Sequence, residues 1–123
     1  MKQPSLRAVH REMSPDALEL VAARFRAMGE PIRLRILQTL EGGEKSVSAI
    51  TGIVGSSQPN VSKHLKVLQD AGLIRRRQDG AAAYYAIADD MVFELCDMVC
   101  VKLRDRLEAQ VGALYGRSVP GRS

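Results

Sequence analysis

The sequence has few of the residues on which secreted and membrane-spanning proteins depend. It holds two cysteines and no tryptophan, and aromatic residues make up 4% of it. Two cysteines cannot form the disulfide framework of a small secreted protein. No apolar run is long enough to span a membrane, and the first residues contain no apolar signal-peptide core. These absences favour a soluble, cytoplasmic protein whose thiols stay reduced.

The sequence also lacks the residue patterns of common catalytic sites. It offers no pair of nucleophile and base, no glycine-rich phosphate loop and no metal-binding triad. Ser62 and His64 are two residues apart in a helical pattern, where their side chains point in different directions and cannot form a dyad. We therefore predict that the protein is not an enzyme.

The sequence does have a net positive charge, and its length fits a single domain. Its 123 residues carry a formal net charge of +4, and 46% of them are hydrophobic. A core of this size often gains stability from a partner subunit. The positive charge is a mild bias toward polyanions such as nucleic acid.

Helical patterns cover the first half of the chain. Ser14 followed by Pro15 predicts the start of a helix that ends at Gly29, and Pro31 opens a second helix through residue 40. Ser46 is the expected cap of a short helix that runs to about residue 54. The buried positions expected in these last two helices are Ile32, Leu34, Ile36, Leu37, Leu40, Val47, Ile50 and Ile53.

The turn "GSSQPN" leads into a further helix predicted over residues 59–72. Its apolar stripe is Val61, Leu65 and Leu68, and Gly72 is placed to end it in a left-handed conformation.

A hairpin and a long helix complete the pattern. The segment "LIRRRQDGAAAYYAI" has β-type runs on both sides of Asp79-Gly80, which predicts a hairpin. The last helix begins after Asp89 and Asp90, and its apolar positions are Val92, Cys96, Val99, Leu103, Leu107, Val111 and Leu114.

Helices joined by a short glycine-containing turn and followed by a hairpin describe a winged helix-turn-helix. We predict a mainly α, dimeric fold of about five helices with a two-stranded β wing. The domain is expected over residues 14–114, between a flexible N-terminal segment (1–13) and a flexible basic tail (115–123). Polar and basic side chains that suit base edges and phosphates gather on the helix over 59–72 and at the start of the hairpin: Gln58, Asn60, Ser62, Lys63, Lys66, Arg75, Arg76 and Arg77. Because neighbouring strand residues alternate between faces, at least one arginine should face away from the buried side of the sheet.

The stretches "RFRAMGEPIRLRILQTL" and "SSQPNVSKHLKVLQDAGLIRRRQDGAAAYYAI" resemble the ArsR/SmtB family of bacterial winged-helix repressors, and the resemblance covers about residues 18–114. It implies a homodimer in which the first and last helices form most of the interface. It also implies an inverted-repeat operator on double-stranded DNA and repression that an inducer relieves. The DNA-reading positions that it implies are Ser57, Gln58, Asn60, Ser62, Lys63 and His64.

His64 has two interpretations. It lies at the edge of the apolar stripe, so it fits a histidine wedged between helix and hairpin with a local hydrogen bond. It fits equally a contact to a phosphate or a base. A lone histidine does not make a metal site.

The metal-binding patterns of the resembled family are missing. Its recurring Cys-x-Cys pair would fall on Ser46 and Ser48, whose hydroxyls are weak ligands for a thiophilic ion. Its zinc pattern uses histidine on the last helix, and that helix has none. A classical zinc sensor is therefore not expected, and we predict no required cofactor.

Cys96 and Cys100 leave a second question open. Residues four apart lie on one face of a helix, so the two thiols suit a soft metal or metalloid inducer such as arsenite, antimonite or copper(I). Oxidation is the other sensing chemistry, although a direct disulfide within a helix is disfavoured. The alternative is that both cysteines only pack the dimer interface, because Glu94 and Asp97 disfavour a reactive thiolate. The protein is then a repressor of the same family without a thiol inducer. A different class of function is a protein-protein adaptor that uses a winged helix without DNA, and its DNA binding would be weak and insensitive to salt.

Overall fold

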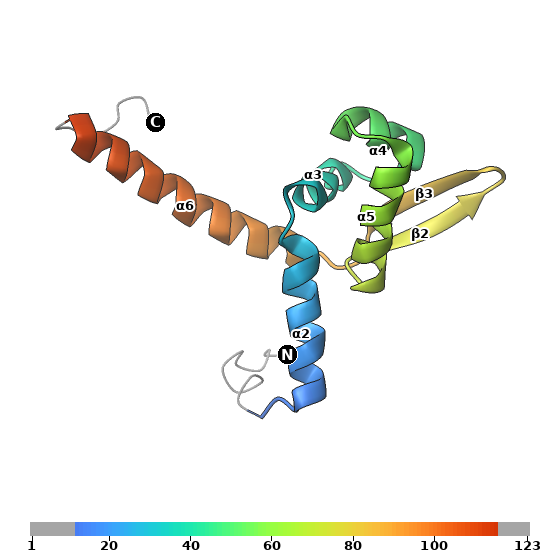
Figure 1. Ribbon diagram of the computed structural model, residues 1–123, viewed down its shortest axis with the longest axis horizontal. Helices are drawn as coiled ribbons and strands as arrows, with labels where there is room; N and C mark the ends of the chain where they lie inside the picture. Colours follow the sequence, from blue (N-terminus) through green and yellow to red (C-terminus); the bar gives the residue numbers. More distant parts are fainter. Residues whose placement is uncertain (1–11, 116–123) are drawn as a thin grey trace, which may run out of the picture. The chain divides into compact units, whose positions relative to one another are not determined.

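The computed structural model describes residues 12–115, except the side chains of the last two. This part of the chain holds five helices and three strands: α2 (Pro15–Met28), α3 (Pro31–Leu40), β1 (Lys45–Ser46), α4 (Val47–Val54), α5 (Gln58–Asp70), β2 (Ile74–Asp79), β3 (Ala82–Ile87) and α6 (Met91–Tyr115). The predicted mainly α winged helix-turn-helix is confirmed (Figure 1). The segments predicted to be flexible lie outside the described residues, apart from residues 12, 13 and 115.

The described part of the chain forms two compact units, which divide between Asp89 and Asp90. The first unit contains α2 to α5 and the sheet, and the second contains α6. Within residues 12–115, no helix is long and apolar enough to span a membrane.

Serine hydroxyls cap three of the helices, and the caps at Ser14 and Ser46 were predicted from the sequence. The Oγ atoms of Ser14 and Ser46 each accept a hydrogen bond at 3.1 Å from the backbone N–H three residues ahead. Ser57 caps α5 in the same way at 3.3 Å, so α5 begins at Gln58, one residue before the predicted start. Such caps satisfy N–H groups that have no partner inside the helix.

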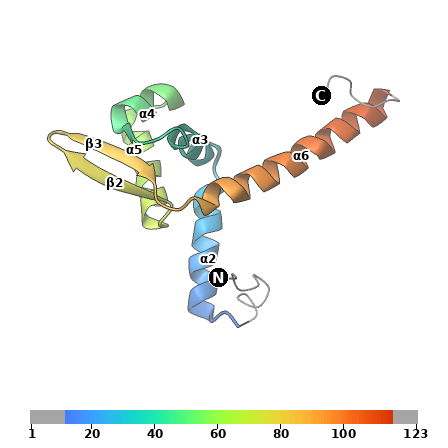
Figure 2. The ribbon, with the colours of Figure 1, turned by 180° about the vertical axis from the view of Figure 1, so that it is seen from behind.

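The core of the first unit lies between α3, α4, α5 and the sheet. Val61, Leu65 and Leu68 of α5 are fully buried, which confirms the predicted stripe. They share the core with other fully or nearly fully buried side chains: Ile36, Leu37, Leu40, Ile50, Leu73 and Ile74. Figure 2 shows the hairpin extending beyond these packed helices.

Two residues predicted to be buried are exposed instead. Leu34 is 38% exposed and Ile53 is 47% exposed, whereas Ile32 and Val47 are half-buried. At about 100° per residue, Leu34 lies roughly 160° around α3 from Ile36, so it faces away from the core. The buried stripe of these short helices is narrower than the apolar pattern alone suggests.

The sheet has one strand more than predicted. Its order is β1-β3-β2, with antiparallel pairing throughout. The unpredicted β1 is two residues long and pairs with Tyr84 and Tyr85 of β3. The predicted turn is confirmed: Gly80 has a positive φ of 62°, and Asp79 pairs directly with Ala82. In the register of the hairpin, Arg76 lies opposite Tyr85 and Arg77 lies opposite Tyr84.

Candidate nucleic-acid interface

The turn between α4 and α5 presents the first turn of α5 to solvent. Gly55 ends α4 in the left-handed conformation, at φ 76° and ψ 34°. A glycine adopts this conformation without the steric cost that a side chain would add. Two residues later Ser57 caps α5. Lys63 and Lys66 are exposed on the side opposite the buried stripe, and Gln58 and Ser62 are exposed beside that stripe near the start of the helix.

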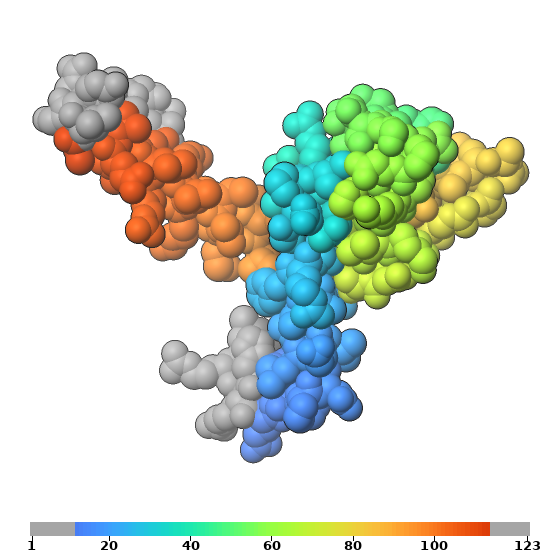
Figure 3. Space-filling model, in the orientation of Figure 1, coloured from blue at the N-terminus to red at the C-terminus, as the bar shows by residue number. Residues whose placement is uncertain are grey.

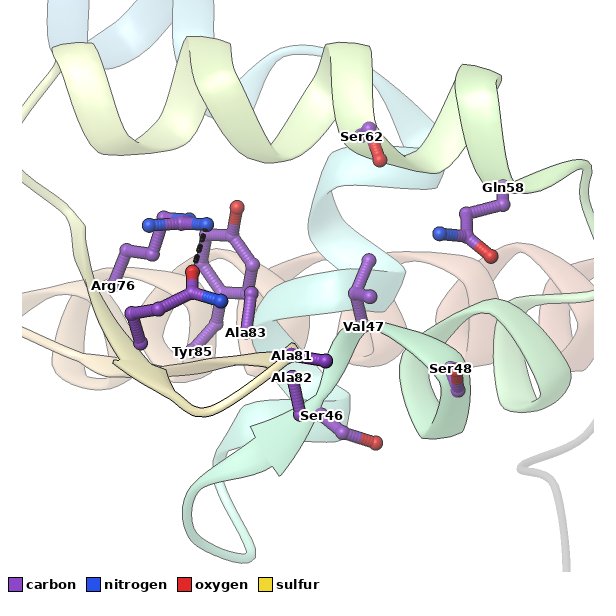
Figure 4. A pocket seen from close by; sticks show the side chains of 11 residues that line it. Ser46, Val47, Ser48, Gln58, Ser62, Arg76, Ala81, Ala82, Ala83 and Tyr85 are labelled. Atoms are coloured by element: carbon purple, nitrogen blue, oxygen red, sulfur yellow. Dashed lines mark hydrogen bonds between the residues drawn. The ribbon is translucent and has the colours of Figure 1, made fainter.

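The polar residues of α5 differ in how far they are already engaged within the chain. Asn60 is half-buried, and its amide Nδ2 donates to Ser56 Oγ at 2.9 Å. Lys66 forms an exposed ion pair with Asp70 at 2.8 Å. Gln58 and Ser62 instead point from α5 toward the cavity that the start of α4 and the hairpin also line (Figure 4). The exposed amide of Gln58 is therefore better placed than that of Asn60 to contact a ligand.

The three consecutive arginines of β2 divide between the two faces of the sheet. Arg76 shares a face with Tyr85 and contributes to the cavity beside α5. Arg75 lies on the other face and donates to the backbone oxygen of Ile87 at 2.6 Å. This division confirms the expected alternation, and the register decides which arginine faces α5.

Arg77 is fully engaged within the chain. Its Nε and Nη2 atoms bind the two carboxylate oxygens of Glu44 at 3.1 and 2.8 Å, and its guanidinium lies 4.8 Å from the centre of the Tyr84 ring. The hydrogen bonds to Glu44 raise the pKa of Arg77 and lower that of Glu44. A guanidinium held in this way does not face α5. Of the three arginines, Arg76 is the one placed beside α5.

A cavity of about 480 Å³ lies between the start of α4, α5 and the hairpin. Figure 4 shows Gln58 and Ser62 above it, and Arg76 with Tyr85 on its hairpin side. Ser46 and Ser48, which stand where the resembled family carries its Cys-x-Cys pair, also line it. Its polar groups are amides, hydroxyls and a guanidinium, which are donors and acceptors for base edges and phosphates rather than ligands for a soft ion.

His64 makes a local hydrogen bond, but its partner is on α3 rather than in the hairpin. The Nδ1 atom of the ring lies 3.1 Å from Arg33 Nη1. Burial lowers the pKa of His64, and the charges of Arg33 and Lys63 lower it further, against an opposing effect of Glu30. The local hydrogen bond of His64 is therefore made to Arg33. The sequence pattern did not suggest this partner, because the two residues are 31 positions apart.

The second unit carries both cysteines. Cys96 is half-buried and Cys100 is exposed, and the structure holds both as thiols. Their spacing of four residues on α6 places them on one face of the helix. Among residues 12–115, no three His, Cys, Asp or Glu side chains are grouped closely enough to hold a metal ion.

Comparison with known proteins identifies the same class of protein as the fold does. Residues 30–76 match the model of the family described as "Bacterial regulatory protein, arsR family". The chain is 39% identical over 82 residues to an uncharacterised HTH-type transcriptional regulator of Methanocaldococcus jannaschii, and the match covers 66% of this chain and 92% of that protein. It is 38% identical over 77 residues to a probable mercury resistance operon repressor of Streptomyces lividans, with 63% of this chain and 62% of that protein covered.

A solved structure extends the likeness to three dimensions. The solution structure of a homodimeric winged helix-turn-helix DNA-binding domain from Mycobacterium bovis superimposes with a TM-score of 0.69 at 32% identity. The match covers 89% of this chain and 95% of that one. These relatives are regulators rather than enzymes, as the sequence predicts for this chain.

Proposed function

The chain belongs to the arsR family of bacterial regulatory proteins, and on that premise we propose that it is a sequence-specific transcriptional repressor that binds an inverted-repeat operator as a homodimer. The observation that carries the proposal is the convergence of Gln58 and Ser62 from α5 with Arg76 from the hairpin around one polar cavity. A duplex is the ligand that such a helix and wing fit together. Acting on DNA, the protein works in the cytoplasm.

The side chains of the interface have distinct roles in this proposal. Gln58 and Asn60 contact base edges, because an amide can donate and accept at the same time. Ser57, Ser62, Lys63 and Lys66 contact phosphates and fix the register of α5 in the major groove. Arg76 is the wing contact. Arg75 and Arg77, predicted from the sequence to bind DNA as well, add only positive charge near the duplex, because they lie on the face of the sheet opposite to Arg76. Arg76 donates to Gln78 Oε1 on its own strand and lines the cavity beside α5.

Exposed apolar side chains on two helices support the dimer. On α2, Leu18, Leu20 and Phe25 are all more than half exposed, and the start of this helix extends away from α3, α4 and α5 (Figures 1 and 3). On α6, Met98, Val99, Leu103 and Leu107 are also more than half exposed. Apolar surface of this extent favours association with a partner. A second copy of the chain covers both helices in the proposed homodimer.

A soft metal or metalloid ion at Cys96 and Cys100 is a second, finer proposal for the inducer. The exposed thiol of Cys100 is accessible from solvent, and Cys96 lies one turn away on the same face. A relative named for mercury resistance supports soft-ion chemistry in this family. Two thiols of one chain leave coordination to be completed by the partner chain or by solvent. If the ion does not act, the two cysteines serve only to pack the dimer.

Variants of α5 test the proposal on an operator selected from random duplexes. Lys63→Ala weakens binding to every sequence and reduces the slope of log K against log salt by about 0.9, because one phosphate contact is lost. Gln58→Ala and Asn60→Ala relax base preference at defined positions of each half-site. Arg35→Ala on α3, an exposed cation outside α5 and α6, is the matched control and leaves affinity unchanged. Equal affinities for all these variants would refute the placement of α5 on DNA.

A separate titration tests the inducer. Arsenite, antimonite, copper(I) and mercury(II) are added to the operator complex of the wild type and of the variant with Cys96→Ser and Cys100→Ser. The proposal expects release from the wild type only. Release that persists in the double variant excludes these cysteines as the inducer site.

A further inference from the structure

Arg33 lies where three helices of the first unit meet. From its place on α3, its Nε atom donates to the backbone oxygen of Ala27 at 2.6 Å, and Nη2 donates to that of Arg26 at 3.0 Å. Its remaining nitrogen, Nη1, lies 3.1 Å from His64 Nδ1 on α5. All three nitrogens of one guanidinium therefore bind the last turn of α2 or the middle of α5.

The contact fixes the protonation state of His64. A guanidinium can only donate hydrogen bonds and keeps its charge at every physiological pH. The Nδ1 atom must therefore accept, so the ring is neutral and carries its proton on Nε2. The lowered pKa of His64, caused by burial first and by Arg33 next, agrees with a neutral ring.

The other two bonds make Arg33 a cap for α2. The carbonyl groups in the last turn of a helix lack partners within the helix and carry partial negative charge. A cation donating to two of them stabilises the end of α2. Arg24 of α2 also lies close to the chain just after α5. If Gly72 carried a Cβ atom, that atom would be 3.3 Å from Arg24 Nη2. Near His64, helices α2 and α5 are thus joined through Arg33 of α3, and Arg24 of α2 also lies beside Gly72, which follows α5.

We propose that Arg33 is a positioning residue for DNA binding, which sets the orientation of α5 relative to α2 through His64 and holds the His64 ring in its Nε2–H tautomer. The inference rests on the proposed function, in which α2 belongs to the dimer interface and α5 binds DNA. In such a dimer the two α5 helices must match half-sites about one helical turn apart, roughly 34–36 Å. The Arg33 contact joins α2, in the proposed dimer interface, to α5. It therefore affects how well the two α5 helices fit the spacing of the half-sites.

The matched pair Arg33→Lys and Arg35→Lys tests this role. Both residues are on α3, but Arg35 is exposed and, within residues 12–115, its side chain forms no hydrogen bond or ion pair with another helix. Lysine keeps the charge at position 33 but cannot direct three bonds in a plane. We expect Arg33→Lys to weaken operator binding about tenfold with an unchanged salt slope, and Arg35→Lys to bind like the wild type. Wild-type affinity for Arg33→Lys overturns the inference. So does a salt slope reduced by about one, which would make Arg33 a phosphate contact.

A second pair of variants leaves the Arg33 cap of α2 in place, so it remains informative if Arg33→Lys folds poorly. The side-chain oxygen of asparagine reaches about as far as Nδ1 of histidine, and the polar end of glutamine reaches about as far as Nε2. We expect His64→Asn to keep operator affinity within about threefold, and His64→Gln to lose about tenfold. The reverse order would mean that His64 acts through Nε2 on DNA, and it would overturn the positioning role.

Nitrogen NMR of the imidazole ring separates this inference from the proposed function. The chain has two histidines, so His10→Gln leaves His64 as the one ring to observe. Without DNA, we expect the Nε2–H tautomer in the wild-type background and a mixture of tautomers with Arg33→Lys. If the spectra behave so but the wild type prefers no DNA sequence, the proposed function fails while the contact stands. If the wild type binds its operator and Arg33→Lys changes neither spectrum nor affinity, the inference alone fails.

Discussion

Helices α5 and α6 have apolar residues at similar spacing. The rest of the chain buries the apolar stripe of α5 but leaves most of that of α6 exposed. Val61, Leu65 and Leu68 of α5 are fully buried, whereas Val99, Leu103 and Leu107 of α6 are each more than half exposed. The sequence pattern identifies a face that needs to be buried without saying what will bury it. The α5 stripe stabilises the fold of the first unit, and we infer that the α6 face stabilises association.

The largest expected effect comes from a substitution in the buried stripe of α5. Leu65→Ala removes a side chain with 0% exposure and leaves a cavity in the core. Such changes cost about 2–5 kcal/mol of unfolding free energy. Denaturant unfolding followed by circular dichroism measures the loss. A loss below about 1 kcal/mol would show that α5 is not held by this core.

The matching change on α6 is expected to act on association instead. Leu103→Ala removes apolar surface at a position that is 54% exposed in the single chain. Burying a leucine contributes about 1.5–3 kcal/mol, and a homodimer buries two copies of Leu103. We therefore expect the dissociation constant of the dimer to rise at least tenfold. Analytical ultracentrifugation over a range of concentrations measures it. An unchanged dissociation constant would place the dimer interface elsewhere.

The arginines of β2 extend the comparison to charged groups. Arg77 has its partners Glu44 and Tyr84 within the chain, whereas Arg76 borders the cavity beside α5. Arg77→Gln should lower stability only slightly, because solvent screens its ion pair with Glu44, and it should change operator affinity little. Arg76→Gln should leave stability unchanged and weaken operator binding several-fold. Thermal melting and fluorescence anisotropy on both variants decide the assignment, which is wrong if the two effects are exchanged.

The features that could be predicted from sequence are those set by neighbouring residues. The caps at Ser14 and Ser46, the stripe of α5 and the turn at Gly80 all depend on short-range patterns. Strand β1 did not follow from its two residues, because it exists only through pairing with β3. In the same way, alternation predicts that the arginines divide between faces, while the register of the sheet selects Arg76.

Contacts between distant residues account for the rest of what was missed. No partner was predicted for Arg33 from the sequence, and only one of the two interpretations of His64 places the ring against the hairpin. Their hydrogen bond joins α3 to α5 across 31 residues, and a pattern read along one helix holds no information on it. Leu34 and Ile53 were predicted to be buried because they are apolar, but the buried stripes of α3 and α4 include only some of the apolar positions.

The smallest expected effect is a pH dependence from His64, another group whose partner is in the chain. Burial and Arg33 hold the pKa of its ring below the usual 6.5. The folded state therefore favours the neutral ring, and this contribution to stability is complete above pH 6.5 and is lost as the pH falls below it. Melting temperatures of the wild type and of His64→Gln should converge toward acid pH. His10→Gln is the control and should follow the wild type, whereas a constant difference at all pH values would contradict the linkage.

The most direct test of the central claim is the salt dependence of binding to the selected operator and to a scrambled duplex, measured by fluorescence anisotropy on the wild-type protein. The account predicts a steep linear fall of log K with log salt on both duplexes, since phosphate contacts supply the shared affinity. It also predicts tighter binding to the operator at every salt concentration, because α5 contacts base edges there. Weak binding that is independent of salt and equal on both duplexes would contradict it and indicate a winged helix that does not act on DNA.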